Sequence, residues 1–423
     1  MKDVKILPSF LKGDIKIPPS KSLCHRAIIA AALSQGQSII NNVVLSEDIL
    51  ATIGGVRALG ALVTFHQDKL IIEGCKLTAE QNCVIDCNES GSTLRFLMPL
   101  GLLTKTAISY VGKGNLCDRP LEPYLEIFKD LGVFYSDIRL PMTISGSLEP
   151  GVFKINGNIS SQFVTGLMFA LPLLDEDSTI LITEPLESKG YIDLTINVLK
   201  NFGISITNHN YRSFSIKGKQ EYKKTNYTVE GDYSQAAFWL AAGALGGDIT
   251  CLGLKRNSKQ SDKAILDILK IAGVSLESSD AYIKVLPSRL QAFEVDVSQC
   301  PDITPILAVL AALSEGTSKI TGAARLRIKE CDRLKAITME LNKLGAQIVE
   351  EKDSLTIKGL EYLQGGDVES WGDHRIAMAL AVAATKCIEP VIIRSSSAVH
   401  KSYPNFFEDY KMLGGILLER NMG

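Results

Sequence analysis

The sequence lacks an apolar run long enough to cross a membrane. Its longest apolar stretches, residues 236–246 and 376–384, are about half of the ~20 residues that a spanning helix needs. Residues 1–14 contain neither the apolar core nor the small-residue cleavage motif of a secretory signal peptide. From these absences we expect a cytoplasmic protein without a membrane partner.

Metal-binding and disulfide patterns are also missing. The 423 residues include five histidines, with no HExxH or HxH pair, and nine cysteines, with no CxxC pair. The closest cysteines, Cys83 and Cys87, have no histidine nearby, so a structural zinc site is not expected. An odd number of cysteines without an export signal indicates reduced, buried thiols. We therefore expect no metal ion and no disulfide framework.

An excess of positive charge is absent as well. Lys and Arg number 45 against 47 Asp and Glu, a formal net charge of −2. This balance argues against nucleic acid or an anionic membrane as the main partner. Hydrophobic residues make up 46% of the chain, which excludes global disorder, and the length predicts two or three domains of about 150 residues each. Any anion-binding site must then come from a local cluster of residues.

What the sequence does contain is one segment type, repeated six times. A short polar motif is followed by an apolar helix of small residues and then by a β-branched run. Successive motifs begin 70 to 72 residues apart. They begin at Ser20, Ser90, Ser160, Asp232, Asp302 and Asp373. Six such segments of about 71 residues account for the whole chain.

A second marker keeps the same period. In each segment an amphipathic helix ends in a glycine just before another strand, and a glycine there can take the left-handed conformation that ends a helix. These glycines are Gly60, Gly132, Gly203, Gly273, Gly345 and Gly414. The two markers together predict six repeats, each ordered strand–helix–strand–helix–strand–strand.

Three repeats can share one core, so we expect an α/β (α+β) protein of two similar domains, each of three βαβαββ repeats, facing across a cleft. The first strand, up to about Pro18, precedes the first polar motif and is expected to pair with the last repeat. We therefore predict an N-terminal domain of residues 19–230 and a discontinuous C-terminal domain of residues 1–18 plus 231–423. The hinge would lie near residues 18–20 and 227–231.

The polar motifs lie at predicted helix N-termini, where unpaired N–H groups and the helix dipole attract anions. Ser and Asp there are also ordinary helix caps, which is the simpler interpretation of any one motif. The residues in and beside these motifs are unusual for helix starts. They are Lys21, Ser22 and Arg26; Arg95; Ser160, Ser161 and Gln162; Asp302; and Asp373, His374 and Arg375. Further basic residues near them are Arg119, Arg325, Arg327, Lys329, Arg333, Lys335 and Lys401. Their common location favours a cleft for a small ligand with several negative charges.

At these residues the sequence resembles a known family. It contains, in order, PPSKSLCHRA, ESGSTLR, DRPL, INGNISSQF, ESKGYIDLT, VEGDYSQAAFWLAAGAL, PDITPILA, RIKECDRL, WGDHRIAMA and HKSYPNFF. Over nearly the whole chain these segments resemble the motifs of the 5-enolpyruvylshikimate-3-phosphate synthases. The resemblance implies two domains of three βαβαββ units and no cofactor. It implies an enzyme that transfers the enolpyruvyl group of phosphoenolpyruvate to the 5-hydroxyl of shikimate 3-phosphate and releases phosphate, the penultimate step to chorismate in aromatic amino acid synthesis.

The resemblance also implies which residues bind the two substrates. For shikimate 3-phosphate they are Lys21, Ser22, Arg26, Ser160, Ser161, Gln162, Ser188, Tyr191, Asp302 and Lys329. For phosphoenolpyruvate they are Lys21, Gly91, Ser92, Arg119, Gln162, Arg333, His374, Arg375 and Lys401. Two of these have an alternative interpretation: Tyr191 as a core aromatic residue, and His374 as a helix-start residue that orients Arg375.

The reaction implied needs one group to accept the hydroxyl proton and one to protonate C3 of phosphoenolpyruvate. By resemblance Asp302 is the base and Glu330 handles the C3 proton. A carboxylate among cations normally has a depressed pKa, which counts against Glu330 as an acid unless burial opposes it. Lys21 is the alternative proton donor, or it stabilises the departing phosphate. Because anionic ligands would neutralise two cationic arrays, we also expect them to favour domain closure.

Two rival functions stay open. The first is enolpyruvyl transfer to UDP-N-acetylglucosamine, whose enzymes share the fold but use a Lys-Asn pair in the first motif and a loop cysteine, for which only Cys117 is a candidate. The pair Lys21-Ser22 favours the shikimate substrate. The second is a non-catalytic scaffold for phosphate or an RNA terminus. Pro19, Glu89 and Arg325 depart from the commonest family pattern, which affects expected affinity and not the reaction class. With no long exposed apolar segment, we expect a monomer.

Overall fold

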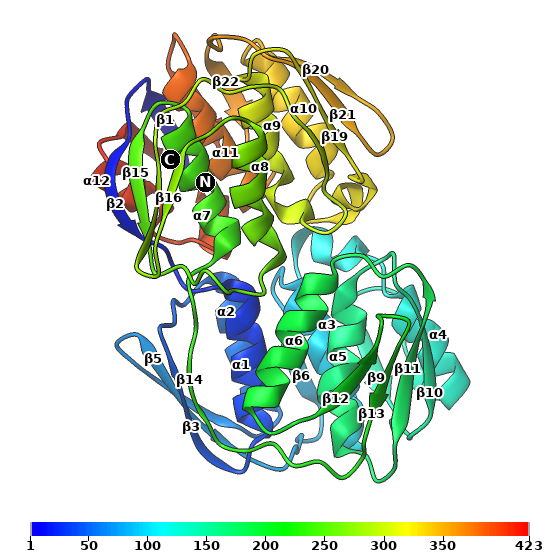
Figure 1. Cartoon of the computed structure of the whole chain (residues 1–423). Helices are drawn as coiled ribbons and strands as arrows, with labels where there is room; N and C mark the ends of the chain where they lie inside the picture. Colours follow the sequence, from blue (N-terminus) through cyan, green and yellow to red (C-terminus); the bar gives the residue numbers. More distant parts are fainter. Residues whose placement is uncertain (1, 422–423) are drawn as a thin grey trace. The chain divides into compact units, whose positions relative to one another are not determined.

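The computed structural model describes residues 2–421 (Figure 1). Contacts between Cα atoms divide the described chain into two compact units. The N-unit is Pro19–Val229, and the C-unit joins the residues up to Pro18 to those from Glu230 onward. Each unit has its own hydrophobic core, so the chain builds two separate folding cores rather than one.

The first three repeats follow the predicted order of elements, which is confirmed. The first contains β2 (Lys12–Lys16), α1 (Lys21–Leu33), β3 (Gly36–Asn41), α2 (Glu47–Ala58), β4 (Leu62–His66) and β5 (Lys69–Gly74). The second contains β6 (Cys83–Asp86), α3 (Gly91–Gly101), β7 (Ile108–Val111), α4 (Glu122–Leu131), β8 (Phe134–Tyr135) and β9 (Met142–Ser145). The third contains β10 (Val152–Asn156), α5 (Ser161–Ala170), β11 (Ser178–Glu184), α6 (Lys189–Asn201), β12 (Ile206–His209) and β13 (Ser213–Ile216).

The last three repeats are built in the same way. The fourth contains β14 (Asn226–Thr228), α7 (Tyr233–Ala244), β15 (Asp248–Leu252), α8 (Ile265–Ile271), β16 (Leu276–Ser278) and β17 (Tyr282–Val285). The fifth contains β18 (Glu294–Asp296), α9 (Thr304–Ala312), β19 (Thr317–Thr321), α10 (Arg333–Lys343), β20 (Gln347–Glu350) and β21 (Leu355–Lys358). The sixth contains β22 (Gly366–Glu369), α11 (His374–Ala383), β23 (Val391–Arg394), α12 (Phe406–Met412) and β24 (Ile416–Asn421), and β1 (Lys2–Leu7) completes its sheet.

The strands of residues 2–421 form six four-stranded sheets. In the second repeat the order is β6-β7-β9-β8, and the third and fifth repeats have the equivalent orders β10-β11-β13-β12 and β18-β19-β21-β20. The first two strands of each sheet are parallel and the remaining pairs are antiparallel. Parallel neighbours need a crossover connection, and the first helix of the repeat provides it in the second, third, fifth and sixth repeats.

Strand pairing at the start of the chain differs partly from the expectation. The segment before Pro18 forms two strands, because Pro8 and the residues after it interrupt the extended run. Only β1 pairs with the last repeat, antiparallel to β23 and β24. Strand β2 instead lies parallel to β15 of the fourth repeat, while β14 lies parallel to β3 of the first repeat. The first and fourth repeats therefore exchange their leading strands, so that β2 belongs to the C-unit and β14 to the N-unit.

The two helices of a repeat have different environments. Every residue of α7, α9 and α11 is buried, and these three helices contact one another in the C-unit (Figure 1). Their side chains are mostly small and apolar, so close packing is possible on all sides. The second helices are amphipathic, as α4 and α10 illustrate, and they end where predicted. All six repeat glycines have φ between 68° and 101°, which confirms their left-handed conformation.

The polar motifs do cap the buried helices, with two exceptions. The side chains of Ser90, Ser160, Asp232 and Asp373 each accept a backbone N–H of the following turn. Ser20 precedes α1 without such a bond. In the fifth repeat a 3-10 turn, η5 (Pro301–Ile303), precedes α9, so Asp302 lies inside the turn and is not the cap. Its carboxylate is thereby available for other partners.

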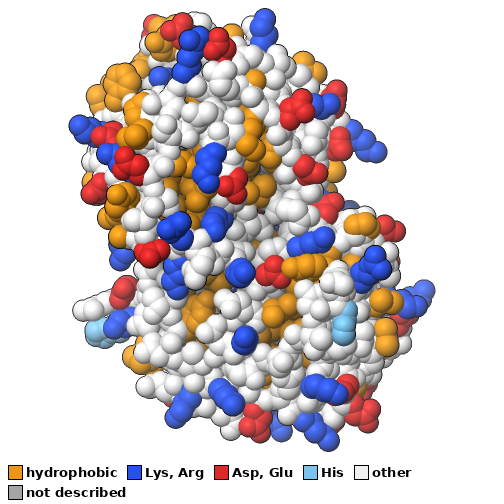
Figure 2. Space-filling model, in the orientation of Figure 1, with side chains coloured by type: hydrophobic (Ala, Val, Ile, Leu, Met, Phe, Trp, Pro, Cys, Tyr) orange, Lys and Arg blue, Asp and Glu red, His pale blue; other side chains and the backbone are white. Residues whose placement is uncertain are grey.

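The visible surface mixes Lys and Arg with Asp and Glu over both units (Figure 2). This agrees with the near-zero net charge of the sequence. Within residues 2–421, no helix combines the length and the apolar character that crossing a membrane requires. Seven of the nine cysteines are buried, while Cys75 and Cys117 are partly exposed.

The contact between α3 and α5 predicts a position that cannot accept a side chain. A Cβ atom at Gly166 of α5 would collide with the Tyr124 hydroxyl and with the Arg95 carbonyl of α3. We predict that Gly166→Ala lowers the free energy of unfolding by about 1–3 kcal/mol through overpacking. At Gly54, in α2, a Cβ atom would meet no neighbouring atom within 4 Å, so Gly54→Ala should raise the same free energy by about 0.5–1 kcal/mol. Urea denaturation of both variants gives the comparison, and equal effects would contradict this packing.

Candidate functional site

In the N-unit, the start of α1 carries a partly buried ion pair. Lys21 Nζ donates to Asp48 Oδ2 at 2.6 Å, with side-chain exposures of 15% and 6%. Asp48 lies in the first turn of α2, so the second helix of the repeat supplies the partner of the first. The short contact with Asp48 holds the Lys21 amine in a fixed place.

A chain of buried hydrogen bonds continues from α1 to α3. His25 Nδ1 lies 2.7 Å from Thr52 Oγ1, which is 2.6 Å from Thr93 Oγ1. Thr93 Oγ1 donates in turn to Ser90 Oγ at 2.8 Å. Burial lowers the pKa of His25 to about 3, so the imidazole is neutral at neutral pH. This chain fixes the cap of α3 relative to α1, and with it the residues that follow Ser90.

Those residues meet side chains from the third repeat. Gln162 Nε2 donates to Ser92 Oγ at 2.9 Å, and Arg95 Nη1 donates to Gln162 Oε1 at 2.7 Å. A Cβ atom at Gly91 would lie 2.7 Å from Arg119 Nη1, so only glycine lets the guanidinium approach. Arg119 Nε is buried and has no hydrogen-bond partner within the described residues. The N-unit thus brings together four residues of the expected phosphoenolpyruvate set: Gly91, Ser92, Arg119 and Gln162.

Arg26 is held by the protein itself. Its Nε donates to Thr195 Oγ1 at 2.8 Å, its Nη1 to the Ser22 carbonyl at 2.7 Å and its Nη2 to the Tyr191 carbonyl at 3.2 Å. Burial lowers the pKa of Arg26 to about 10, which still leaves it charged. Arg26 therefore joins the starts of α1 and α6. Tyr191 is partly buried and packs against the core.

The remaining N-unit candidates lie at helix starts. Ser160 caps α5 and Ser161 is its first residue. Ser188 precedes α6 in the left-handed conformation, with φ of 53°, and is buried. Hydroxyl groups beside free helix N–H groups form a suitable environment for a phosphate.

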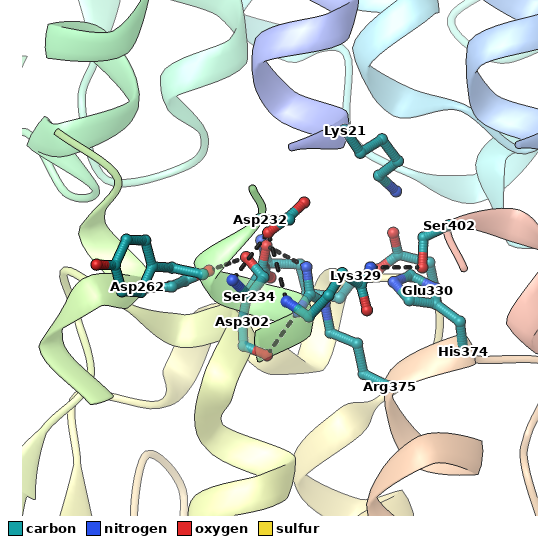
Figure 3. Close-up of polar contacts among 12 residues, drawn as sticks. Lys21, Asp232, Ser234, Asp262, Asp302, Lys329, Glu330, His374, Arg375 and Ser402 are labelled. Carbon is teal, nitrogen blue, oxygen red and sulfur yellow. Dashed lines mark hydrogen bonds and ion pairs between the residues drawn. The ribbon is translucent and has the colours of Figure 1, made fainter. Parts of the chain in front are cut away.

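In the C-unit, one guanidinium organises three carboxylates, and Figure 3 shows two of these, Asp302 and Glu330. Arg333, the first residue of α10, is 1% exposed. Its Nη1 lies 2.9 Å from Asp302 Oδ1, its Nη2 2.7 Å from Glu330 Oε2, and its Nε 2.7 Å from Asp373 Oδ2. The acidic partners and α10 belong to the fifth and sixth repeats, so this cation joins two repeats.

Asp302 has two more cationic neighbours. Arg375 Nη2 lies 3.2 Å from Asp302 Oδ2, and its Nη1 donates to the Asp302 carbonyl at 3.1 Å. Lys329 Nζ lies 3.4 Å from Asp302 Oδ1. Burial alone would raise the pKa of Asp302, but Arg375, Lys329 and Arg333 together hold it well below the usual range. Asp302 is therefore an ionised carboxylate that carries no proton at neutral pH.

Lys329 is affected in the opposite direction. Burial lowers the pKa of its amine to about 8, although Asp302 opposes this shift. The positive charge of Arg325, one of the departures from the commonest family pattern, lowers it further. Arg325 is itself buried, in the 3-10 turn η6 (Ala324–Ile328). Lys329 is thus a cation that loses its charge just above neutral pH.

Two further predicted site residues, His374 and Lys401, belong to the sixth repeat and lie near the starts of its helices. His374 is the first residue of α11 and is 1% exposed, beside the Asp373 cap. Its Nδ1 lies 3.9 Å from Asp373 Oδ1. Lys401 is buried and ends the 3-10 turn η8 (Ser396–Lys401) that precedes α12.

Asp48 and Asp262 are buried at the same helix ends but were not among the predicted site residues, and no positioning role was predicted for Asp373 or Arg95. A signal for the first two exists in the sequence. In each repeat a polar residue follows the first-helix motif by 28 to 30 positions: Asp48, Arg119, Ser188, Asp262, Glu330 and Lys401. Four of these six were expected site residues, and the shared spacing would have indicated Asp48 and Asp262.

Within the part of the chain that the structure describes, no group of three or more His, Cys, Asp or Glu side chains is arranged to hold a metal ion. The carboxylates of Asp302, Glu330 and Asp373 are instead paired with guanidinium groups and, at Asp302, with an amine. Such a site has the chemistry to bind anions and to keep a carboxylate available as a base.

Comparisons with known proteins agree with this chemistry. The family model described as EPSP synthase (3-phosphoshikimate 1-carboxyvinyltransferase) matches residues 7–410. A 3-phosphoshikimate 1-carboxyvinyltransferase of Clostridium perfringens is 56% identical over 421 residues, covering 99% of each chain. Proteins with the same name from Clostridium novyi and Clostridioides difficile are 51% and 50% identical over the full length of both chains.

Solved structures with the same fold are more distant in sequence. An EPSP synthase from Acinetobacter baumannii has a TM-score of 0.84 at 24% identity and covers 100% of both chains. The enolpyruvyl transferase NikO from Streptomyces tendae has a TM-score of 0.81 at 16% identity, covering 100% of this chain and 99% of that one. At these identities the likeness establishes the fold, two-part and mixed α/β, and nothing about substrate.

The buried guanidinium predicts a large stability effect. Arg333→Met would leave Asp302, Glu330 and Asp373 without their shared cation, so we expect the free energy of unfolding to fall by about 3–5 kcal/mol. Arg289→Met is the matched control, because Arg289 pairs with Glu315 at an exposed position, where an ion pair contributes about 0–1 kcal/mol. Urea denaturation at pH 7 measures both. Equal losses would show that Arg333 does not hold the carboxylates.

Proposed function

This chain belongs to the EPSP synthase (3-phosphoshikimate 1-carboxyvinyltransferase) family, and on that premise we propose how its residues carry out the family reaction. It transfers the enolpyruvyl group of phosphoenolpyruvate to the 5-hydroxyl of shikimate 3-phosphate and releases phosphate. The observation that carries the function is 50–56% identity to enzymes of that name along the full length of the chain. The ionised Asp302 among three cations supports the chemistry.

We propose that the N-unit supplies anion-binding groups for both substrates. Gly91, Ser92, Arg119 and Gln162 would bind phosphoenolpyruvate, supported by the close approach of Arg119 to Gly91 and by the buried Nε of Arg119. The helix-start hydroxyls Ser22, Ser160, Ser161 and Ser188 would bind the phosphate of shikimate 3-phosphate. Three further residues would complete this set. Lys21 is held by Asp48, and Arg26 is joined to Tyr191 through its guanidinium.

In the C-unit, Asp302 is proposed as the base for the 5-hydroxyl. Three cations keep its carboxylate ionised, so it can accept the hydroxyl proton as the oxygen attacks C2 of phosphoenolpyruvate. Lys329 would bind shikimate 3-phosphate near that carboxylate. Arg333, His374, Arg375 and Lys401 would bind phosphoenolpyruvate, whose carboxylate and phosphate need several positive charges.

The reaction also needs a group that protonates C3 of phosphoenolpyruvate and later takes a proton back from C3. We assign this transfer to Glu330, whose carboxylate is fixed by Arg333 at 2.7 Å, with Lys21 as the alternative donor. When the tetrahedral intermediate loses phosphate, C3 gives back a proton and the double bond forms. Cations near the phosphate stabilise the negative charge that develops on it.

We also propose three coarser properties. The N-unit and the C-unit would be the two domains, with the hinge near residues 18–20 and 227–231, where the chain passes from one unit to the other. The protein would be a monomer, since exposed apolar side chains such as Phe10, Leu62, Val152 and Ile388 belong to different segments. It would act in the cytoplasm, on small molecules and without a cofactor. Light scattering coupled to size-exclusion chromatography tests the monomer.

One assay separates the proposed function from its two rivals. Phosphate release from phosphoenolpyruvate should require shikimate 3-phosphate, and UDP-N-acetylglucosamine should not replace it. Asp302→Asn should lower kcat by about 100- to 10,000-fold, the usual contribution of a general base. Asp367→Asn is the control, because Asp367 pairs with Arg394 at a half-exposed position. Release that depends on the UDP-sugar, or no release with either acceptor, would overturn the proposal.

A further inference from the structure

The segment WGDHRIAMA supplies three residues of the candidate site, beginning with Asp373, but its first residue, Trp371, has no part in the proposed reaction. Trp371 and Gly372 both have a left-handed backbone conformation, with φ of 56° and 64°. The Asp373 N–H donates to the Ser370 carbonyl at 3.0 Å and closes a four-residue turn, residues 370–373, which we call the Trp371 turn. Two successive positive φ values are typical of a type I′ turn, whose central residues are usually Gly, Asn or Asp. A bulky tryptophan therefore lies in a backbone conformation that it disfavours.

Such a conformation persists only where the surrounding structure imposes it, and Glu340 of α10 provides that constraint. The Glu340 side chain is 1% exposed. Its Oε1 accepts the indole N–H of Trp371 at 2.8 Å, and its Oε2 accepts the backbone N–H of Glu369 at 3.0 Å. Lys343 Nζ donates to both oxygens, at 2.9 and 2.7 Å. One carboxylate thus holds the indole and the backbone just before the Trp371 turn.

A carboxylate in this buried place has a cost. Burying a charge is unfavourable unless the charge is paired and hydrogen-bonded. Apolar residues of similar size often replace a buried ion pair without loss of stability. Stability alone therefore gives no reason for a carboxylate on this face of α10, whereas the bonds to Trp371 and Glu369 give one.

The Trp371 turn leads directly into the cap of α11. Arg333 lies seven positions before Glu340, about two turns away on the same face of α10, and its Nε binds Asp373 Oδ2 at 2.7 Å. Helix α10 therefore holds this segment at two points, Trp371 and Asp373. Asp373 Oδ1 accepts the backbone N–H of Arg375 at 2.8 Å. The place from which the Arg375 side chain extends follows from these contacts.

We propose that Glu340 is a positioning residue for phosphoenolpyruvate, which holds the Trp371 turn and thereby places the Arg375 guanidinium where this substrate binds. The proposal rests on the proposed function, since it concerns the same reaction. Without the Glu340 carboxylate, the Trp371 indole loses its acceptor and the turn can relax toward a conformation that tryptophan prefers. Asp373 and Arg375 would then move with the turn.

The Michaelis constants test this role. Glu340→Ala should raise KM for phosphoenolpyruvate about tenfold, because a small displacement of a binding group is costly, and should change kcat less than about threefold. KM for shikimate 3-phosphate should stay within about twofold, since none of the residues assigned to it follows the Trp371 turn directly. A purely structural role gives a different result: partial unfolding lowers the concentration of active enzyme, and with it the apparent kcat, but leaves KM unchanged.

Lys343→Met is the matched control. It removes the same ion pair as Glu340→Ala but keeps the carboxylate and its bonds to Trp371 and Glu369. The Lys343 side chain is 46% exposed, and an ion pair at such a position contributes little. Both Michaelis constants of Lys343→Met should therefore equal those of the unmodified enzyme.

Trp371→Phe tests the contact from its other side. It keeps an aromatic ring and removes the indole N–H, so KM for phosphoenolpyruvate should rise in this variant as well. If Glu340 acts through Trp371, the double variant should resemble the more affected single variant, whereas independent roles would multiply the two effects. Trp371→Phe alone keeps the test decisive if Glu340→Ala does not fold, because an unchanged KM for phosphoenolpyruvate in Trp371→Phe would overturn the proposal.

Fluorescence reports on the turn without any assay of activity. The chain has two tryptophans, and Trp239 is fully buried, so the difference between a protein and its Trp371→Phe variant isolates the Trp371 signal. Acrylamide should quench that signal more strongly in Glu340→Ala than in the unmodified protein or in Lys343→Met. Equal quenching in all three would show that Glu340 does not hold the indole.

The outcomes separate this inference from the proposed function. Absence of phosphate release that depends on shikimate 3-phosphate, in the unmodified protein, would overturn the proposed function. An active enzyme in which Glu340→Ala leaves KM for phosphoenolpyruvate unchanged, or raises both Michaelis constants equally, would overturn the role of Glu340 alone. A rise for phosphoenolpyruvate only, with stronger quenching of Trp371 and an unaffected Lys343→Met, supports it.

Discussion

The buried guanidinium of Arg333 is the interaction on which the C-unit site depends. It binds Asp302, Glu330 and Asp373 at 2.7–2.9 Å, and removing it would leave three carboxylates in a region with little access to water. Burying these charges costs free energy that only close, well-directed ion pairs can offset. Arg333 therefore fixes three segments relative to one another. They are the turn that contains Asp302, the segment before α10 that contains Glu330, and the cap of α11, Asp373. A carboxylate held this way is ionised and in position before any substrate arrives.

The repeat explains why such a cluster forms at all. Six apolar helices are buried along almost their whole length, and the charged groups of the candidate site lie at or near the starts of these helices. Each repeat then brings the start of its second helical segment beside the start of its first, 28 to 30 residues later. The same position holds Asp48 in one repeat, Arg119 in another and Lys401 in a third. The same backbone arrangement thus places an acidic, basic or hydroxyl side chain at the equivalent position of each repeat. The chemistry of each helix start depends on which residue occupies that position.

Much of this could be predicted from the sequence, because it depends on local signals. The glycines that end the second helices and the caps at Ser90, Ser160, Asp232 and Asp373 follow from backbone preferences within one turn. The exchange of β2 and β14 could not be predicted, since a strand carries no local record of which neighbour it pairs with. Asp302 looked like a helix start and proved to lie in a separate turn. Asp48 and Asp262 were missed because a capping aspartate and a buried ionic one look alike until their partners are known.

The ionisation of Asp302 tests the account most directly. Carbon-13 NMR of protein labelled at aspartate carboxyl carbons, with Asp302→Asn to assign the signal, measures it in the intact chain. The cations around Asp302 predict a chemical shift that does not change between about pH 8 and pH 4, whereas an ordinary aspartate is about half protonated at the lower limit. A midpoint for Asp302 inside that range would mean that Arg333, Arg375 and Lys329 do not hold the carboxylate in its charged form, and the proposed base would have no structural support.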